Sequence, residues 1–159
     1  MDDFDAFVAL LEYPVYVVTA AVGDERAGCL VGFAGQCSIR PPRFTVWISK
    51  ANHTHAVASR AGVLVVHLLP HRRHDLAELF GGQSGDEVDK FAAVPWIPGP
   101  DGVPVLTGAA AWFAGRVHHR TDGGDHTGFL LDPLVTRTTA PGEPLTSRDV
   151  SDIDAGHPA

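Results

Sequence analysis

The feature that most constrains the fold is a series of short β-branched and aromatic runs, each bounded by glycine or proline. Such residues favour extended backbone, while glycine and proline punctuate strands. Runs at this spacing are typical of antiparallel barrels and sandwiches. We therefore predict a mainly β protein, an antiparallel barrel or sandwich with six or seven strands. The expected strands are 13–22, 26–38, 43–49, 63–69, 103–107, 109–119 and 126–135.

Two of these runs carry more specific information. The run 26–38 is interrupted by small residues, among them Gly28, Gly32 and Gly35. Glycine inside a strand marks a bulge, or a place where another group approaches the backbone closely. The run 63–69 (VLVVHLL) is apolar without alternation. It therefore predicts a strand that is buried on both faces.

Helices are expected to be few, short and peripheral. The pattern predicts helices at 55–61 and 73–80 and a helical turn at 86–93, too little for a doubly wound sheet. Pro133 is expected to mark the end of the last strand, because proline has no N–H for the ladder. We therefore predict a barrel domain over 1–135. A polar C-terminal tail over 136–159, mobile or laid along a partner, follows it.

The charge distribution is uneven. The chain has 159 residues and a net charge of −7, which disfavours nucleic acid as the main partner. Yet no acidic residue lies between Glu25 and Asp75, a segment that contains seven Lys and Arg residues. This segment indicates a small anionic ligand, or alternatively only a solvated basic surface. No apolar run approaches the ~20 residues that span a bilayer, so no membrane association is expected.

The two cysteines, Cys29 and Cys37, do not predict a disulfide. On one extended strand, eight residues would hold them about 26 Å apart, far beyond bridging distance. The acidic start at residues 1–5 is unlike the basic start of a signal peptide. We therefore expect a reduced, cytoplasmic protein.

Residues 50–54 (KANHT) lead from an expected strand end into an expected helix. A helix N-terminus offers unpaired N–H groups, and Lys50 adds charge while Asn52 and Thr54 add donors. These N–H groups, the charge and the side-chain donors together suit the binding of a phosphate. The alternative is that Asn52 or Thr54 simply caps the helix.

Other candidate residues are ambiguous on their own. Gly124 and Asp125 lie in an expected hairpin turn over 121–125, and with His126 they can be only a turn and an incidental histidine, while Phe91 can be ordinary core. The nine histidines show no spacing typical of a metal site, so no metal is expected. Nucleophile elbow, P-loop and dinucleotide-binding glycine motifs are absent from the sequence.

Taken in order, several short motifs resemble the flavin reductase-like family, whose fold is the FMN-binding split β-barrel. The resemblance covers about residues 10–135, and it rests on the order and spacing of the motifs. These are Pro14–Thr19, Gly28, Ser38–Pro42, Lys50–Thr54, Lys90–Phe91, Gly102–Leu106, Ala111–Phe113 and Gly124–His126.

The resemblance implies FMN or FAD as the flavin and NAD(P)H as co-substrate, bound at a homodimer interface. His126 would lie by the reactive face of the flavin and help to position nicotinamide, with Asp125 beside it. Phe91 would pack near the flavin. The phosphate would be held by Ser49, Lys50, Asn52 and Thr54. The isoalloxazine would be lined, mostly through backbone groups, by Gly32, Phe33, Ala34, Gln36, Cys37 and Ser38.

The implied activity is hydride transfer from nicotinamide to flavin, supplying reduced flavin to a partner monooxygenase. Because the cofactors carry that reaction, no acid–base triad is required. Two alternatives stay open: a flavoprotein that keeps FMN and acts on its own organic substrate, and a barrel that binds a small molecule without redox turnover. The chain departs from the family at Asn52, where Ser is common, and at 33–37, which is less rich in Ser and Thr.

Overall fold

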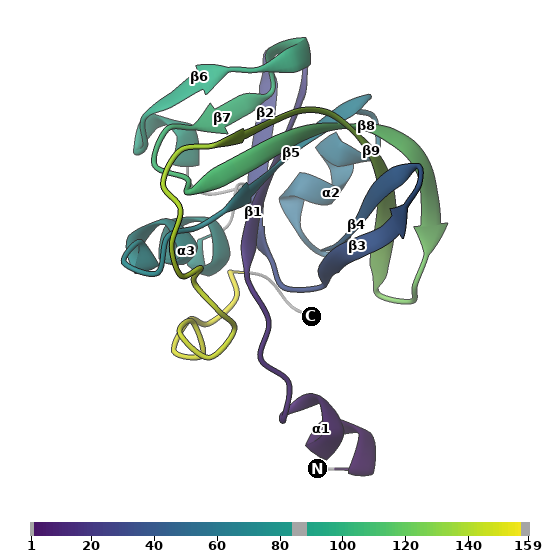
Figure 1. Ribbon diagram of the computed structural model, residues 1–159, viewed down its shortest axis with the longest axis vertical. Coiled ribbons are helices and arrows are strands. Elements are labelled where there is room, and N and C mark those ends of the chain that lie inside the picture. Colours follow the sequence, from purple (N-terminus) through teal and green to yellow (C-terminus); the bar gives the residue numbers. More distant parts are fainter. Residues whose placement is uncertain (1, 84–88, 157–159) are drawn as a thin grey trace.

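The computed structural model describes residues 2–83 and 89–156, and its main element is a curved seven-stranded antiparallel sheet (Figure 1). The strands follow the order β2-β1-β5-β8-β9-β4-β3. This confirms the predicted mainly β split barrel. The strands are β1 (Tyr16–Val22), β2 (Glu25–Val31), β3 (Ala34–Ile39), β4 (Pro42–Ser49), β5 (Val63–Leu68), β8 (Ala111–Asp122) and β9 (His126–Thr138).

The barrel is split between β2 and β3, which form the two edges of the sheet. The prediction of one strand over 26–38 is therefore wrong, because the chain leaves one edge at Val31 and joins the other at Ala34. At the crossing the Trp47 N–H donates to the Phe33 carbonyl at 2.9 Å. Gly32 thus marks a change of strand, not a bulge within one.

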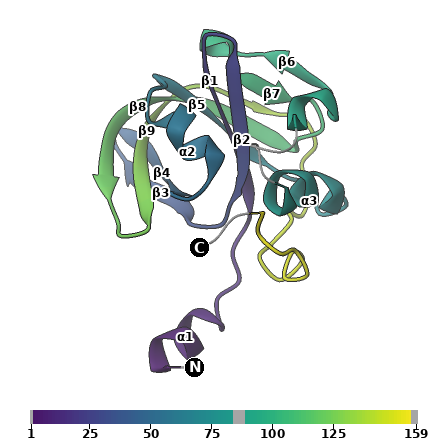
Figure 2. The same cartoon turned by 180° about the vertical axis from the view of Figure 1, so that it is seen from behind.

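The barrel interior is filled by side chains from β1 and β5 together with helix α2 (His53–Ala58), which lies in the hollow of the sheet (Figures 1 and 2). On β5, Leu64 and Val66 point inward to this cluster, whereas Val63 and Val65 belong to a cluster on the opposite face. The prediction that this strand is buried on both faces is confirmed.

The outer face of the sheet is covered by α3 (His74–Gly82) and by a small second sheet of β6 (Trp96–Pro98) and β7 (Pro104–Leu106). Two short 3-10 helices, η1 (Lys90–Ala92) and η2 (Pro100–Gly102), flank this sheet. The two longer predicted helices exist, displaced by one to three residues at each end. Part of the expected turn at 86–93 lies outside the described residues.

The last strand extends beyond its predicted end at residue 135 and continues to Thr138. Pro133 sits inside β9 opposite Gly115, where the register with β8 shifts. This irregularity accommodates a residue that has no ladder donor. Beyond the strand, Leu145 is buried and donates its N–H to the Leu69 carbonyl at 3.0 Å. This part of the polar segment therefore packs on the chain's own core.

A helix that the sequence analysis did not predict, α1 (Asp3–Val8), stands apart from the barrel (Figures 1 and 2). It begins with a capping box between Asp2 and Asp5, and none of its residues is buried. Phe4 is 70% exposed and Leu10, just after the helix, is 75% exposed. Among the described residues, no helix is long and apolar enough to cross a membrane.

Candidate functional site

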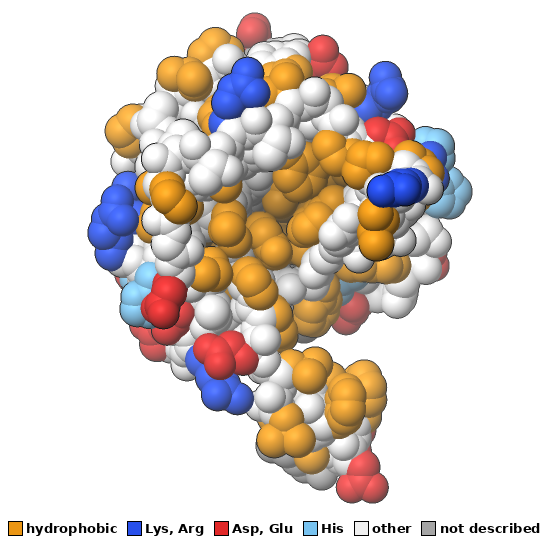
Figure 3. Space-filling view, viewed as in Figure 1, with side chains coloured by type: hydrophobic (Ala, Val, Ile, Leu, Met, Phe, Trp, Pro, Cys, Tyr) orange, Lys and Arg blue, Asp and Glu red, His pale blue; other side chains and the backbone are white. Residues whose placement is uncertain are grey.

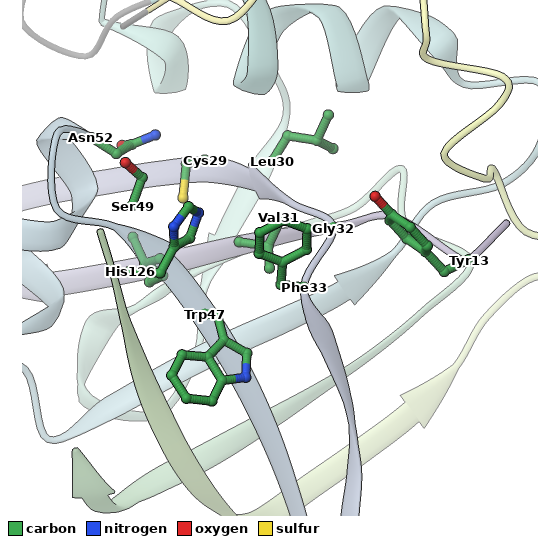
Figure 4. Close-up of a pocket in the computed structure, with 11 residues that line it drawn as sticks. Tyr13, Cys29, Leu30, Val31, Gly32, Phe33, Trp47, Ser49, Asn52 and His126 are labelled. Carbon is green, nitrogen blue, oxygen red and sulfur yellow. The ribbon is translucent and has the colours of Figure 1, made fainter. Parts of the chain in front are cut away.

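A pocket opens at the split of the barrel, where the chain crosses from β2 to β3 (Figure 4). Its volume is about 230 Å³. The end of β4 and the start of β9 form the facing wall. The lining residues are Tyr13, Cys29, Leu30, Val31, Gly32, Phe33, Trp47, Ile48, Ser49, Asn52 and His126.

Strand pairing brings His126 to this pocket. In the β4–β9 ladder Ser49 pairs with His126, and the Lys50 N–H donates to the Asp125 carbonyl at 2.9 Å. The His126 Nδ1 lies 2.7 Å from the Asp125 carboxylate, and this contact holds the pKa of Asp125 below its ordinary value. The β8–β9 hairpin therefore fixes His126 beside the end of β4.

The polar end of the pocket is formed by Ser49 and Asn52. The Ser49 hydroxyl accepts the Ala51 N–H at 3.2 Å, and Asn52 Oδ1 accepts the Thr54 N–H at 2.9 Å. Asn52 is thus the N-cap of α2, as one of the two interpretations predicted. Because the cap uses Oδ1, the NH2 group of Asn52 is still able to donate a hydrogen bond to a ligand.

Thr54, which the sequence analysis assigned to the phosphate, does not line the pocket. It is buried, and its hydroxyl hydrogen-bonds the thiol of Cys29. Burial raises the pKa of Cys29 to about 11, so the thiol stays protonated at neutral pH. Cys29 therefore contributes a neutral wall to the pocket, while Cys37 carries an exposed free thiol.

Four of the seven Lys and Arg residues in the basic segment 26–74 pair with carboxylates. Lys50 Nζ lies 2.6 Å from the Asp122 carboxylate, which lowers the pKa of Asp122. Three arginines of the segment also pair with carboxylates: Arg43 with Asp132, Arg60 with Glu25, and Arg73 with Asp75. The positive charge of this segment is therefore smaller on the surface of the folded protein than the sequence indicates.

The structure brings together only some of the residues predicted to contact the flavin ring. Gly32 and Phe33 line the pocket, and Ala34 begins β3 immediately beyond it. Gln36, Cys37 and Ser38 lie farther along that edge strand, outside the pocket lining. Gln36 and Cys37 are exposed there.

Phe91 lies in a different part of the molecule. Its ring packs between Phe80 and Trp96, at centroid distances of 5.7 and 6.0 Å, in the cluster beneath α3. Gly28 of β2 touches the same cluster, because a Cβ there would lie 2.9 Å from the Phe80 ring and 3.2 Å from Phe91. Within this chain Phe91 is thus a core residue, as the alternative interpretation held.

Sequence reasoning missed two aromatic residues of the pocket, Tyr13 and Trp47. A Cβ at Gly32 would lie 2.9 Å from the Tyr13 ring. The Trp47 indole lies against Gly123 and Gly128, where a Cβ would come within 2.5 and 2.7 Å of it. Glycines on the hairpin were a signal for a close approach, but only the β4–β9 register identifies Trp47 as the residue that approaches.

The pocket combines the β2–β3 crossing, where the Phe33 ring is exposed, with a polar end at Ser49 and Asn52. Such a site suits a flat ring system that carries a polar chain. Within residues 2–83 and 89–156, no three His, Cys, Asp or Glu side chains are grouped as metal ligands.

Comparison with known proteins identifies the family. The sequence profile of the flavin reductase-like domain matches residues 8–146, and the chain belongs to that family. The chain is 30% identical to an FMN reductase (NADH) of Stutzerimonas stutzeri over 134 residues, 84% of this chain and 76% of that protein. It is 33% identical over 103 residues to the reductase subunit of a flavin-dependent monooxygenase of Rhodococcus jostii, 62% of this chain and 51% of the relative.

Solved structures show the same fold. The NADH:FAD oxidoreductase of Streptomyces globisporus superposes with a TM-score of 0.82 at 25% sequence identity, over 90% of this chain and 85% of that one. Several other relatives are considerably longer, and this chain spans only 60% and 35% of two of them.

Proposed function

We propose that this protein is an NAD(P)H:flavin oxidoreductase that binds FMN, or FAD, in the pocket at the split of the barrel. One observation carries the proposal: the crossing at Gly32–Phe33 opens a pocket where the exposed phenyl ring, the polar end and the histidine meet. Membership of the flavin reductase-like family supports it.

The bound flavin would accept a hydride from C4 of the reduced nicotinamide, which leaves as NAD(P)+. The chain supplies binding, orientation and exclusion of water. The exposed ring of Phe33 would lie against the ring system, with the backbone at Gly32 close to it. Ser49 and the NH2 group of Asn52 would donate to the phosphate.

Lys50 is the cation nearest this polar end in sequence, and Asp122 holds it by an exposed ion pair. Exposed pairs of this kind contribute little, on the order of 0–1 kcal/mol, so a phosphate can compete for the ammonium group. We propose that Lys50 exchanges Asp122 for the flavin phosphate, wholly or in part, when the flavin binds.

His126 would position the nicotinamide and would not be an obligatory proton donor. If Nδ1 carries the ring proton, it donates to Asp125 at 2.7 Å, and Nε2 becomes the acceptor. The histidine side chain is three-quarters buried against the pocket wall, so its orientation is restrained.

We further propose that the protein works as a homodimer and delivers reduced flavin to a monooxygenase. The exposed apolar residues of α1 support the first part, and the naming of the Rhodococcus jostii relative as a monooxygenase reductase subunit supports the second. The boundary at residue 135 between a barrel domain and a C-terminal tail remains a prediction, as does the cytoplasmic location.

The test is an anaerobic visible spectrum of the protein with one equivalent of FMN, before and after NADH is added. Bleaching of the flavin band faster than with FMN alone supports the reductase. A flavin that binds but stays oxidised contradicts it, and favours a flavoprotein with its own substrate. If no flavin binds, the remaining interpretation is a barrel that binds a small molecule without redox turnover.

A variant separates the role of His126 from flavin binding. His126→Ala is expected to slow flavin reduction in stopped-flow measurements by more than it weakens FMN binding by titration. The opposite result would assign His126 to flavin binding. Lys50→Ala with Asn52→Ala is the complementary pair, expected to weaken FMN binding. An unchanged FMN affinity would contradict the phosphate assignment.

A further inference from the structure

A second cavity, of about 450 Å³, lies between the start of α3, the end of β7 and the end of β9. It is at the end of the β8–β9 hairpin opposite to the turn beside His126 (Figure 1). The 13 residues of β9 separate the two ends, about 40 Å along the strand. Among the described residues, this cavity and the pocket at the split share no lining residue. We call it the arginine recess, and its lining includes Arg72, Arg73, Pro95, Thr107, Gly108 and Thr139.

The walls of the arginine recess are joined to one another by hydrogen bonds. The Thr107 N–H donates to the Pro95 carbonyl at 3.3 Å. The Thr139 hydroxyl donates to the Ala109 carbonyl at 2.7 Å, and the Thr139 N–H donates to the Ala110 carbonyl at 2.8 Å. Segments that are far apart in the chain are thereby held together, so the recess is a preformed feature of the fold.

Arg73 lines the recess with part of its guanidinium group unused. Asp75 accepts from Nε at 2.9 Å and from Nη2 at 3.1 Å, and these two bonds fix the plane of the group. Nη1 lies over Gly108, where an added Cβ would collide with it. Within residues 2–83 and 89–156, Nη1 donates no hydrogen bond. Its N–H groups are therefore available to an acceptor in the recess.

Arg72 adds a charge that no carboxylate of the described residues balances. It is one of the three basic residues of segment 26–74 that form no ion pair there. Of the other two, Arg26 lies 5.0 Å from the centre of the Trp96 ring, and Arg40 follows the end of β3. Arg72 is exposed and lines the recess. The small anionic ligand that the acid-free segment indicated therefore has a second candidate site besides the pocket.

We propose that the arginine recess binds a small organic carboxylate, in a site separate from the flavin pocket. Arg72, Arg73 and Asp75 together carry one net positive charge, which a single carboxylate balances. A phosphate dianion would bring excess negative charge beside Asp75. Guanidinium groups bind a carboxylate through paired N–H donors, and the exposed ring of Pro95 would contact the organic part. This inference does not depend on the proposed reductase activity.

The first test measures binding to the wild type by isothermal titration. The probes are benzoate, its uncharged counterpart benzamide, and the dianion phenyl phosphate. Benzoate is expected to bind saturably, phenyl phosphate more weakly, and benzamide not at all. No saturable binding up to about 10 mM benzoate would overturn the proposal, and so would equal binding of benzamide. Tighter binding of phenyl phosphate than of benzoate would overturn the carboxylate assignment.

Variants locate the bound carboxylate. Arg72→Gln should raise the Kd for benzoate about tenfold, the size of one hydrogen bond to a charged group. Gly108→Ala should also raise it, because the added methyl group displaces the Arg73 guanidinium, the flexible end of a side chain. Arg137→Gln removes the same charge from the exposed end of β9, outside the recess, and should change the Kd by less than about twofold. Wild-type affinity in both recess variants would overturn the site, and an equal loss in Arg137→Gln would make long-range charge responsible.

A titration in the presence of saturating FMN separates the arginine recess from the flavin pocket. The Kd for benzoate is expected to stay unchanged, because the two cavities share no lining residue among those described. Loss of benzoate binding would place the acid in the flavin pocket and overturn the inference. If the protein binds no FMN, the proposed function fails, whereas the Arg72→Gln and Gly108→Ala variants still decide whether the recess is a carboxylate site.

Discussion

His67 illustrates how single residues are fixed by backbone groups. It lies fully buried in β5, where Nδ1 is 2.8 Å from the Val17 carbonyl and Nε2 is 3.0 Å from the Leu106 N–H. A carbonyl only accepts and an N–H only donates, so the ring is neutral with its proton on Nδ1. Burial lowers its pKa from about 6.5 to about 4. This histidine connects β1, β5 and β7 and takes no part in the pocket.

The stability of the protein should therefore depend on pH through His67. Its folded-state pKa lies below the unfolded value, so the unfolded state binds more protons between pH 6.5 and 4. The stabilisation is complete above pH 6.5 and is lost as the pH falls through 4, by about 3 kcal/mol. Urea unfolding at pH 7, 5.5 and 4.5 measures it. His67→Gln, which cannot titrate, should lose less; an equal loss would contradict the assignment.

The Lys50–Asp122 pair makes a prediction about affinity. If the flavin phosphate competes with Asp122 for Lys50, then Asp122→Asn should tighten FMN binding and Lys50→Ala should weaken it. Each change should be about two- to fivefold, because an exposed pair contributes less than ~1 kcal/mol. Isothermal titration gives both affinities. Arg60→Ala removes a similar exposed pair on another part of the surface. If Arg60→Ala has the same effect as Lys50→Ala, long-range charge is responsible.

At the scale of elements, Lys90 attaches α3 to the edge of the barrel. It is buried, and its ammonium group donates to the Gly28 carbonyl of β2 at 3.0 Å and to the Phe80 carbonyl of α3 at 3.1 Å. Burial lowers the pKa of Lys90, so these bonds are needed to keep the charge inside. One side chain thereby links a helix to an unpaired strand edge.

Replacing Lys90 should loosen that link. We expect Lys90→Met to lower the free energy of unfolding by about 2 kcal/mol, the range for hydrogen bonds from a charged donor. Amide exchange within α3 should become faster than in the barrel strands. Chemical denaturation and hydrogen exchange check the two effects. Arg137→Met, on the exposed end of β9, is the control and should change neither.

At the scale of the whole molecule, the notable surface belongs to residues 2–11, which include α1 and which we call the N-terminal arm. Apolar side chains gather over α1 and on the hollowed face of the barrel (Figure 3). The arm continues into Glu12 and Tyr13, which are hydrogen-bonded to Thr146 and Ser147. Tyr13 lines the pocket. A partner that covers the N-terminal arm would therefore bind only a few residues along the chain from the site.

We expect a second copy of the chain to cover this arm. Phe4→Glu with Phe7→Glu should then shift the protein from dimer to monomer in sedimentation velocity, because burial of two charged residues is costly. Asp3→Lys on the same helix keeps the apolar face and should leave the dimer intact. A wild-type monomer at high concentration would contradict the proposed homodimer.

Sequence patterns predicted much of the fold because they report local preferences. The unbroken apolar run of β5 indicated burial on both faces, and Asn52 before α2 indicated a cap, since both depend on adjacent residues. The order of short motifs identified the family. The crossing at Gly32 escaped prediction because it does not differ locally from a glycine-bearing strand. The short helix α1 was missed although Asp2 and Asp5 form a capping box at its start.

The sequence by itself thus determined most of the strands, the helices α2 and α3, and the family, each a property of neighbouring residues. Only the tertiary structure decided that Lys50 meets Asp122, that Trp47 rests on Gly128, and that Phe91 lies beneath α3. It also removed Gln36 and Cys37 from the pocket. The contact of Trp47 with Gly128 depends on the register between β4 and β9, where one residue of slip would exchange the faces of every side chain. The place of Phe91 depends on the packing of η1 beneath α3.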